Sequence, residues 1–143
     1  IRDIGVTGVQ TCALPICREQ VEPYRKRWRL AAKGEVFPGV SIMPLHGHTP
    51  GHSGYLVASG NEQLLIWGDI VHVPEVQTAR PEACMVFDSD ASQAEATRRR
   101  IFDHVTADKL MVTGMHMHFP GFSRLVKAGT GYRLIPAAWE QAL

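Results

Sequence analysis

The chain has 143 residues and a formal net charge of +1, with 45% hydrophobic and 20% charged residues. These values are typical of a single globular domain, and no stretch approaches the roughly 20 apolar residues of a membrane-spanning helix. The charge balance gives no reason to expect nucleic acid or a membrane as a partner, because both usually leave a clustered basic signature. The oligomeric state stays open.

The first residues resemble something other than evolved protein. Residues 6–16 resemble the conceptual translation of a common sequencing-library adapter, and residues 1–3 fit the same adapter upstream. We therefore expect residues 1–17 to be adapter-derived and residues 18–143 to be the evolved part. The alternative is an ordinary glycine-rich lead-in strand. An adapter origin would place the true amino terminus outside the sequence, so the compartment stays open between cytoplasm and export.

Helix and strand signals lead up to a histidine loop. Apolar residues at helical spacing predict a helix over residues 19–32. A short strand over residues 36–37 and a Pro38-Gly39 turn then lead into a strand over residues 40–45. This strand delivers the chain to the motif Gly-His-Thr-Pro-Gly-His at residues 47–52.

A β-hairpin is predicted directly after this loop. Residues 53–59 and 63–68 have strand character and flank Gly60-Asn61, which is a hairpin turn signal. The antiparallel ladder would place Asp69 roughly opposite Ser53. An ionised carboxylate after a mostly apolar strand is costly to bury unless it is paired or bound to a cation. We therefore interpret Asp69 as a candidate ligand.

His48 lies just before the hairpin, on a turn whose glycines permit unusual φ angles and whose proline stiffens the backbone. Its ring could be aimed at the Asp69 carboxylate, so a metal ion could bridge the two side chains. The alternatives are a hydrogen-bonded surface or core histidine for His48, and a helix cap or loop carboxylate for Asp69.

The remaining chain alternates between helix and strand signals, which predicts an α/β fold. The predicted elements are a loop over 71–81, a strand over 83–87, a helix from about 90 to 105, a strand over 109–113 and a hairpin of strands 123–128 and 132–135. Asp90 and Gln93 have capping-box spacing at the helix start, and capping together with the helix dipole also explains Asp88. Four residues of this helix are expected in the core: Ala94, Ile101, Phe102 and Val105. The basic runs at 25–29 and 98–100 are expected on solvated helix faces.

Three motifs together resemble the metallo-β-lactamase fold superfamily. They are residues 47–52, Trp-Gly-Asp at 67–69 and His-Met-His-Phe-Pro-Gly at 116–121, in the order and spacing of that family. Residues 65–73 and 87–90 look most like its methyl parathion hydrolase and lactonase-like branch. The resemblance implies an αββα sandwich of which this chain would form the C-terminal half.

The resemblance also implies a site and a chemistry. His48 would bind one metal ion, Asp69 would bridge two, and His116 would complete the second, with His48 and Asp69 as the catalytic residues. Relatives hold two divalent ions; zinc is favoured here, with iron, manganese or cobalt as alternatives. A metal-bound hydroxide would hydrolyse an ester-like bond of a small-molecule substrate, such as a lactone, phosphotriester, thioester or β-lactam.

The other histidines have weaker assignments. His118 stands two residues after His116 and would share its face in an extended segment, but the Phe119-Pro120-Gly121 anchor favours His116 as the ligand. His52 is expected to hydrogen-bond a ligand, and His72 and His118 are expected to line the pocket or support the ligands.

The family's H-x-H-x-D-H cluster does not occur in this sequence, in which all seven histidines lie from His46 onward. We therefore expect the chain to be a fragment of a metal-dependent hydrolase with negligible activity of its own. Strand residues around Leu56, Leu65, Ile66 and Val112 would then be left uncovered. The alternatives are an iron-dependent persulfide dioxygenase of the same fold and a non-catalytic member that lacks the first metal cluster.

Overall fold

The chain divides into a unit that ends at Leu30 and a unit over Ala31–Leu143. The computed structural model describes residues 16–29, 31 and 33–139. The expectation of an adapter origin for residues 1–17 therefore lies outside the described residues, apart from Ile16 and Cys17.

The helix expected over residues 19–32 is shorter than predicted. Residues 16–21 are α-helical, and the 3-10 helix η1 follows over Glu22–Arg27. Pro23 has no amide hydrogen, and its ring would clash with the carbonyl of an α-helical residue four positions earlier. The prediction overlooked this proline, which ends the α-helix, and no residue of η1 is buried.

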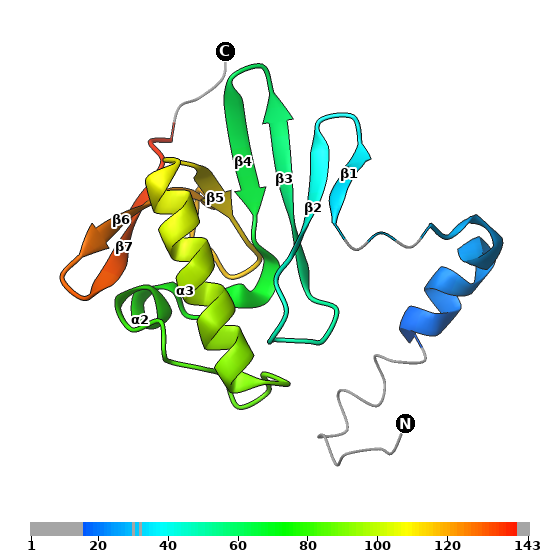
Figure 1. Cartoon of the computed structure of the whole chain (residues 1–143), viewed down its shortest axis with the longest axis horizontal. Coiled ribbons are helices and arrows are strands. Elements are labelled where there is room, and N and C mark those ends of the chain that lie inside the picture. Colours follow the sequence, from blue (N-terminus) through cyan, green and yellow to red (C-terminus); the bar gives the residue numbers. More distant parts are fainter. Residues whose placement is uncertain (1–15, 30, 32, 140–143) are drawn as a thin grey trace. The chain divides into compact units, whose positions relative to one another are not determined.

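The second unit contains one seven-stranded sheet whose spatial order is the chain order, β1 to β7 (Figure 1). Its strands are β1 Gly34–Phe37, β2 Val40–Pro44, β3 Ser53–Ser59, β4 Glu62–Ile66, β5 Met111–Thr113, β6 Phe122–Ala128 and β7 Gly131–Pro136. Neighbouring strands are antiparallel except β4 and β5, which are parallel. The two predicted hairpins are β3–β4 and β6–β7, and both are confirmed together with the α/β class.

The long helix α3, Ala91–Ala107, joins the two halves of the sheet and begins at the predicted cap. The Asp90 side chain accepts a hydrogen bond from the Gln93 amide at 2.9 Å. The Asp90 amide donates to the Gly47 carbonyl at 3.0 Å, so the cap also attaches the histidine loop to the helix. The four predicted core residues of α3 are all at most 5% exposed, as expected: Ala94, Ile101, Phe102 and Val105.

Two predictions between β4 and α3 are wrong. The segment 71–81, expected as a loop, contains the helix α2, Pro74–Ala79. Proline suits the first helical turn, where its missing amide hydrogen has no intrahelical acceptor. The segment 83–87, expected as a strand, has no regular element. The Asp88 carboxylate accepts from the Met85 amide at 2.9 Å, and the Asp88 amide donates to the Met85 carbonyl at 3.0 Å, which closes a turn instead.

The four strand residues expected to be uncovered are mostly covered. Leu65 and Val112 are fully buried in the same hydrophobic cluster as the apolar side of α3. Leu56 and Ile66 are half-buried, and Leu56 packs against this cluster. The expectation is therefore wrong for Leu65 and Val112, because it ignored the helix that returns across one face of the sheet between β4 and β5.

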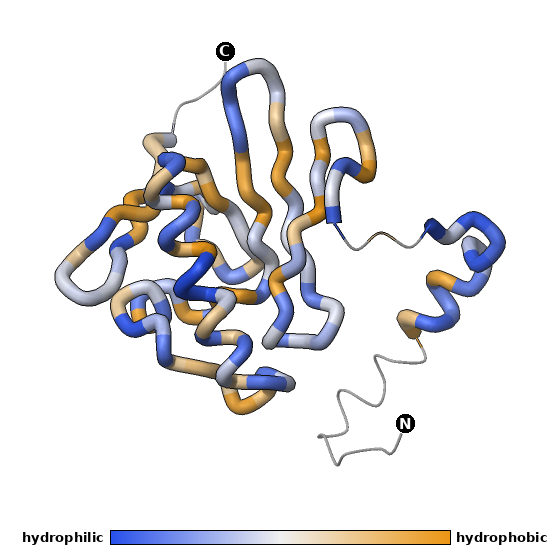
Figure 2. The backbone as a smooth tube through the Cα atoms, viewed as in Figure 1, coloured by the Kyte–Doolittle hydropathy of each residue, from blue (hydrophilic) through white to orange (hydrophobic). Residues whose placement is uncertain are grey.

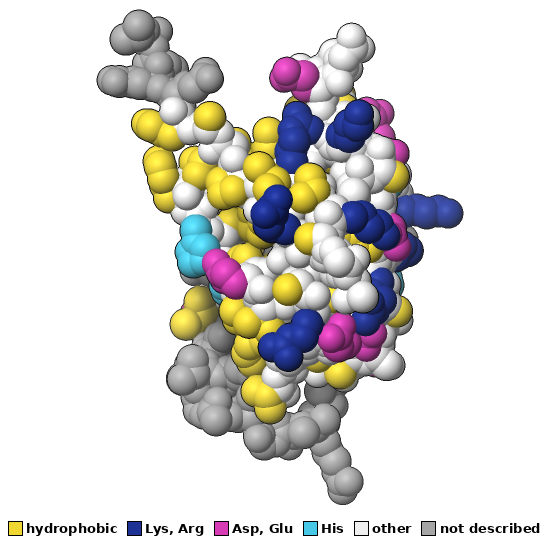
Figure 3. Space-filling model, turned by 90° about the vertical axis from the view of Figure 1, so that its left-hand side faces the viewer, with side chains coloured by type: hydrophobic (Ala, Val, Ile, Leu, Met, Phe, Trp, Pro, Cys, Tyr) yellow, Lys and Arg dark blue, Asp and Glu magenta, His cyan; other side chains and the backbone are white. Residues whose placement is uncertain are grey.

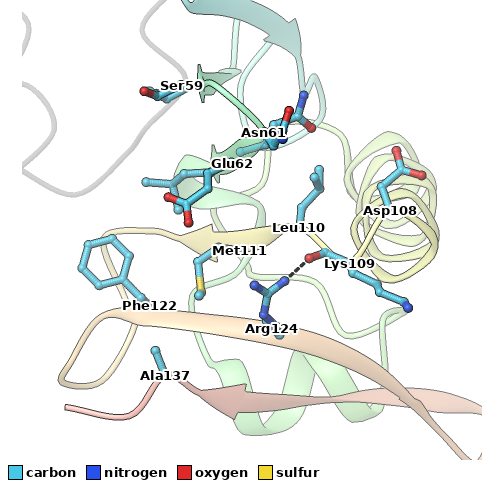
Figure 4. A pocket seen from close by; sticks show the side chains of 13 residues that line it. Ser59, Asn61, Glu62, Asp108, Lys109, Leu110, Met111, Phe122, Arg124 and Ala137 are labelled. Atoms are coloured by element: carbon cyan, nitrogen blue, oxygen red, sulfur yellow. Dashed lines mark hydrogen bonds between the residues drawn. The ribbon is translucent and has the colours of Figure 1, made fainter. Parts of the chain in front are cut away.

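The opposite face of the sheet is more open. Side chains alternate between the two faces of a strand, so Leu64 and Met111, which neighbour Leu65 and Val112, point away from α3. With the 44% exposed Phe122, they contribute to the lining of a hollow of about 550 Å³ (Figure 4). Hydrophobic residues run along β3, β4 and β5 in Figure 2. The apolar character of the central strands thus extends to a face without a covering layer among the described residues.

The charged residues include one clear exception to prediction. Lys and Arg side chains are interspersed with acidic ones on the face in Figure 3. Arg99 and Arg100 are exposed, as predicted, but Arg98 is fully buried. Consecutive residues of an α-helix point in different directions, so a basic run cannot lie wholly on one face.

Among the described residues, no helix has the length and apolarity that crossing a membrane requires.

Candidate metal centre

The histidine loop between β2 and β3 lies against the start of α3. Gly47 has a φ of +131°, and a Cβ atom there would lie 2.3 Å from the backbone nitrogen of Ala94. Glycine permits both this φ and this close approach. The loop is therefore held at the helix start, and His48, the next residue, is directed from it.

Asp69 follows β4 in the short 3-10 helix η2, Gly68–Ile70. Its backbone amide donates to His52 Nε2 at 2.9 Å, and His52 Nδ1 lies 2.9 Å from the Leu45 carbonyl, to which it donates. Asp69 therefore meets His52 and not Ser53, one residue from the predicted position. Because both ring nitrogens of His52 are occupied, this residue positions the Asp69 backbone and offers no nitrogen to a metal.

The Asp69 carboxylate lies between two imidazoles. Its Oδ2 atom is 3.6 Å from His48 Nε2, and its Oδ1 atom is 3.6 Å from His116 Nε2. Both distances are longer than ordinary hydrogen bonds. The structure thus brings together the three residues predicted as ligands, from the loop after β2, the end of β4 and the loop after β5.

His72 lies between His48 and His116, with its ring centroid 4.8 Å from each of theirs. Burial is the largest cause that lowers the pKa of His72; the neighbouring His48 and His116 lower it further, and Asp69 opposes them. The lowered pKa favours the neutral ring, which keeps a lone pair available. The sequence predicted only a pocket position or a supporting role for this residue.

Asp88 belongs to this site, although the sequence was interpreted differently. Its side chain is fully buried, and its Oδ1 atom lies 3.0 Å from His48 Nδ1. A carboxylate only accepts hydrogen bonds, so Nδ1 carries the proton and Nε2 is the ring nitrogen that faces Asp69. One signal was available in the sequence, because Asp90 already fills the helix cap and leaves Asp88 without that role.

The donor set fits a divalent metal ion. Ligand atoms of Asp69, His72 and His116 lie within 4.8 Å of one another, as do those of His48, His72 and Asp88. The first group, joined by His48, is the better candidate because Asp88 is already hydrogen-bonded. Asp69 Oδ1 and His72 Nδ1 are buried without a hydrogen-bond partner among the described residues, whereas buried polar atoms are usually paired. Neutral imidazoles with a carboxylate suit zinc and related ions.

Of two residues near the cluster, one lies apart from it and the other packs against it. His118 does not join the cluster: it is exposed, and its Nε2 atom lies 2.8 Å from Glu75 Oε1. Phe87 instead packs edge-on against the rings of His48 and His72, with centroid distances of 5.9 and 5.0 Å. The Phe87 side chain is 45% exposed. Its ring therefore lines one side of the candidate site and is itself partly open to solvent.

Known proteins share this arrangement of elements. Hydrolase AbOPH of the beta-lactamase superfamily is 28% identical, with a TM-score of 0.77 over 87% of this chain and 44% of that one. AidC, a dizinc quorum-quenching lactonase, is 20% identical, with a TM-score of 0.80 over 89% and 44%. A probable metal-dependent hydrolase from Staphylococcus aureus is 16% identical, with a TM-score of 0.60 over 77% and 40%. A search of curated proteins finds no match.

The chain therefore spans less than half the length of these solved structures. Its seven-stranded sheet and helices match part of a metallo-β-lactamase-type αββα sandwich, as the sequence predicted. The sequence model of the metallo-beta-lactamase superfamily matches residues 16–116. Because this match covers most of the 143 residues, the chain belongs to the metallo-β-lactamase superfamily.

Proposed function

We propose that this chain supplies one part of the metal centre of a metal-dependent hydrolase. The observation that carries the proposal is the convergence of three imidazoles on the Asp69 carboxylate, with unpartnered buried atoms on Asp69 and His72. His48, Asp69 and His116 would hold the metal, and His72 faces the same space with a further neutral ring. The 28% identity to hydrolase AbOPH supports the reaction class.

The residues of the chain contribute orientation and charge. Asp88 holds the His48 ring by its Nδ1–H group, so that the Nε2 lone pair points into the site. The Asp69 carboxylate adds negative charge that a cation would neutralise. When bound, a divalent ion of this kind lowers the pKa of a water molecule and polarises a carbonyl or phosphoryl oxygen. Phe87 would exclude water from one side of the substrate.

The substrate we propose is a small molecule with an ester-like bond, such as a lactone, phosphotriester, thioester or β-lactam. The number of metal ions proposed for the intact site is two, with zinc favoured over iron, manganese or cobalt. Since the sequence contains no H-x-H-x-D-H cluster, the chain alone has too few ligands for two ions. We further propose that residues 1–17 are adapter-derived and contribute nothing to this function.

A zinc titration of the whole chain tests the ligand set. His116→Ala removes an imidazole from the site and is expected to weaken zinc binding by about 100-fold or more, since even changes to residues around metal ligands cost 10- to 100-fold. His104→Ala is the matched control, because His104 is a part-exposed histidine of α3 that pairs with Asp108. Isothermal titration calorimetry measures both. Equal affinities for the two variants would contradict the proposed site.

Hydrolysis by the purified chain provides a second test. With zinc present, the chain is expected to cleave aryl esters, lactones and phosphotriesters no faster than zinc in buffer, because one set of ligands is missing. Chromogenic substrates measure this directly. Metal-dependent turnover well above the buffer rate that is abolished by Asp69→Asn would contradict the expected inactivity and at the same time support the hydrolase assignment.

A further inference from the structure

Arg98 is a fully buried arginine whose guanidinium ties together the segment between β4 and α3. Its Nε atom donates to the Ile70 carbonyl at 2.6 Å, and its Nη1 atom donates to the carbonyls of Pro81 and Ala83 at 2.6 and 3.0 Å. These acceptors lie on both sides of α2. The guanidinium therefore holds the two ends of the segment that carries His72.

The same side chain faces the carboxylate of Asp88. Arg98 Nη2 lies 3.9 Å from Asp88 Oδ2, and the two side chains are 1% and 0% exposed. The other carboxylate oxygen, Oδ1, lies 3.0 Å from His48 Nδ1. An ionised carboxylate buried without a counter-charge is strongly disfavoured. A row of three groups thus runs from the buried Arg98 on α3 through the buried Asp88 to the half-buried candidate ligand His48.

We propose that Arg98 is a positioning residue for the metal centre. Its guanidinium supplies the opposite charge beside the buried Asp88 carboxylate, Asp88 Oδ1 accepts a hydrogen bond from His48 Nδ1, and the His48 ring is thereby held with Nε2 toward the site. This role rests on the proposed function, in which His48 is a metal ligand. Arginine suits it because the planar guanidinium offers several donors at fixed angles, whereas lysine offers one ammonium group.

A double-mutant cycle on the whole chain tests this role. The variants are Arg98→Met, Asp88→Asn and the combination, with Arg99→Met as the control because Arg99 is an exposed neighbour that pairs with Glu82 and Glu95. The first readout is the position of the ring proton of His48 in the metal-free protein, from long-range proton–nitrogen NMR spectra. The second readout is zinc affinity by calorimetry.

Arg98→Met is expected to reduce the Nδ1–H form of His48 and to weaken zinc binding by about 10-fold, the lower range for residues that support a metal ligand. In the Asp88→Asn background, the same substitution should change neither readout further. Arg99→Met should leave both readouts at their wild-type values. A merely structural arginine would act equally in both backgrounds, and that additive result would overturn the proposal.

The two readouts separate this inference from the proposed function. If the wild-type chain binds no zinc, the proposed function fails, but the ring proton of His48 still reports on Arg98. If zinc binds and Arg98→Met leaves the ring proton unchanged, only the positioning role fails. Should Arg98→Met lose its near-ultraviolet circular dichroism, Arg98→Lys replaces it in the cycle; this variant keeps the charge but lacks the fixed set of guanidinium donors, so the same non-additivity is required.

Discussion

Gly47→Ala is expected to lower the free energy of unfolding by roughly 3 kcal/mol or more, because it combines backbone strain with overpacking. The φ of +131° at Gly47 is rarely adopted by residues with a side chain, and the new Cβ would lie 2.3 Å from the Ala94 nitrogen. The obstacle is backbone of α3, so a side-chain rotation cannot relieve it. Urea denaturation measures the change, and zinc titration should show a parallel loss because the loop carries His48.

Gly51→Ala is the matched control in the same six-residue motif. A Cβ at Gly51 would meet nothing within 4 Å, and this glycine has no positive φ. We expect a change within about 0.5 kcal/mol, as for most surface substitutions. Equal destabilisation by the two alanines would show that the loop does not lie against α3 as described.

Trp67→Ala is the second change with a large expected effect. Trp67 is fully buried in the core, and its ring lies 5.8 Å from that of Phe102. Removal of a buried aromatic ring costs about 3–5 kcal/mol. A Cβ at Gly114 would lie 2.5 Å from Trp67 Nε1, so the tryptophan also spaces the loop after β5 from the end of β4. Both unfolding free energy and zinc affinity should therefore fall.

Trp139→Ala provides the control for this change. Trp139 is 67% exposed and contacts the ring of Phe119, so its removal should change the unfolding free energy by about 0.5 kcal/mol or less. Zinc affinity should stay at the wild-type value. If Trp67→Ala reduces stability but leaves zinc affinity unaltered in the folded protein, the spacing role of Trp67 is wrong and only its core role remains.

Elements set by local signals were predicted well. The Gly60-Asn61 turn defined the β3–β4 hairpin, because a two-residue turn fixes the register of its strands. The cap at Asp90 and the apolar spacing of α3 identified that helix and its core face, because capping and periodicity act within a few residues. The errors near Pro23 and Pro74 also concern local signals. Pro23 ends an α-helix and Pro74 begins one, and neither proline was taken into account.

The residues of the candidate site also fall into those that the sequence identified and those that only the fold revealed. Sequence motifs identified His48, Asp69 and His116 as candidate ligands, and the structure places these three together. Asp88 and Arg98 were missed because their environment depends on how distant segments pack. Polarity alone favours an exposed position for both residues, and only the fold shows that each is buried beside an opposite charge.

The sequence alone determined the family resemblance, the α/β class and the histidines and carboxylate from which a metal site could be built. The tertiary structure decided that His72 lies between two candidate ligands, that the ring nitrogens of His52 are occupied by backbone groups, and that His118 lies apart with Glu75. The physical reason is that a side chain's chemistry is local, whereas its burial, its hydrogen-bond partners and its neighbouring charges come from segments brought together only by folding.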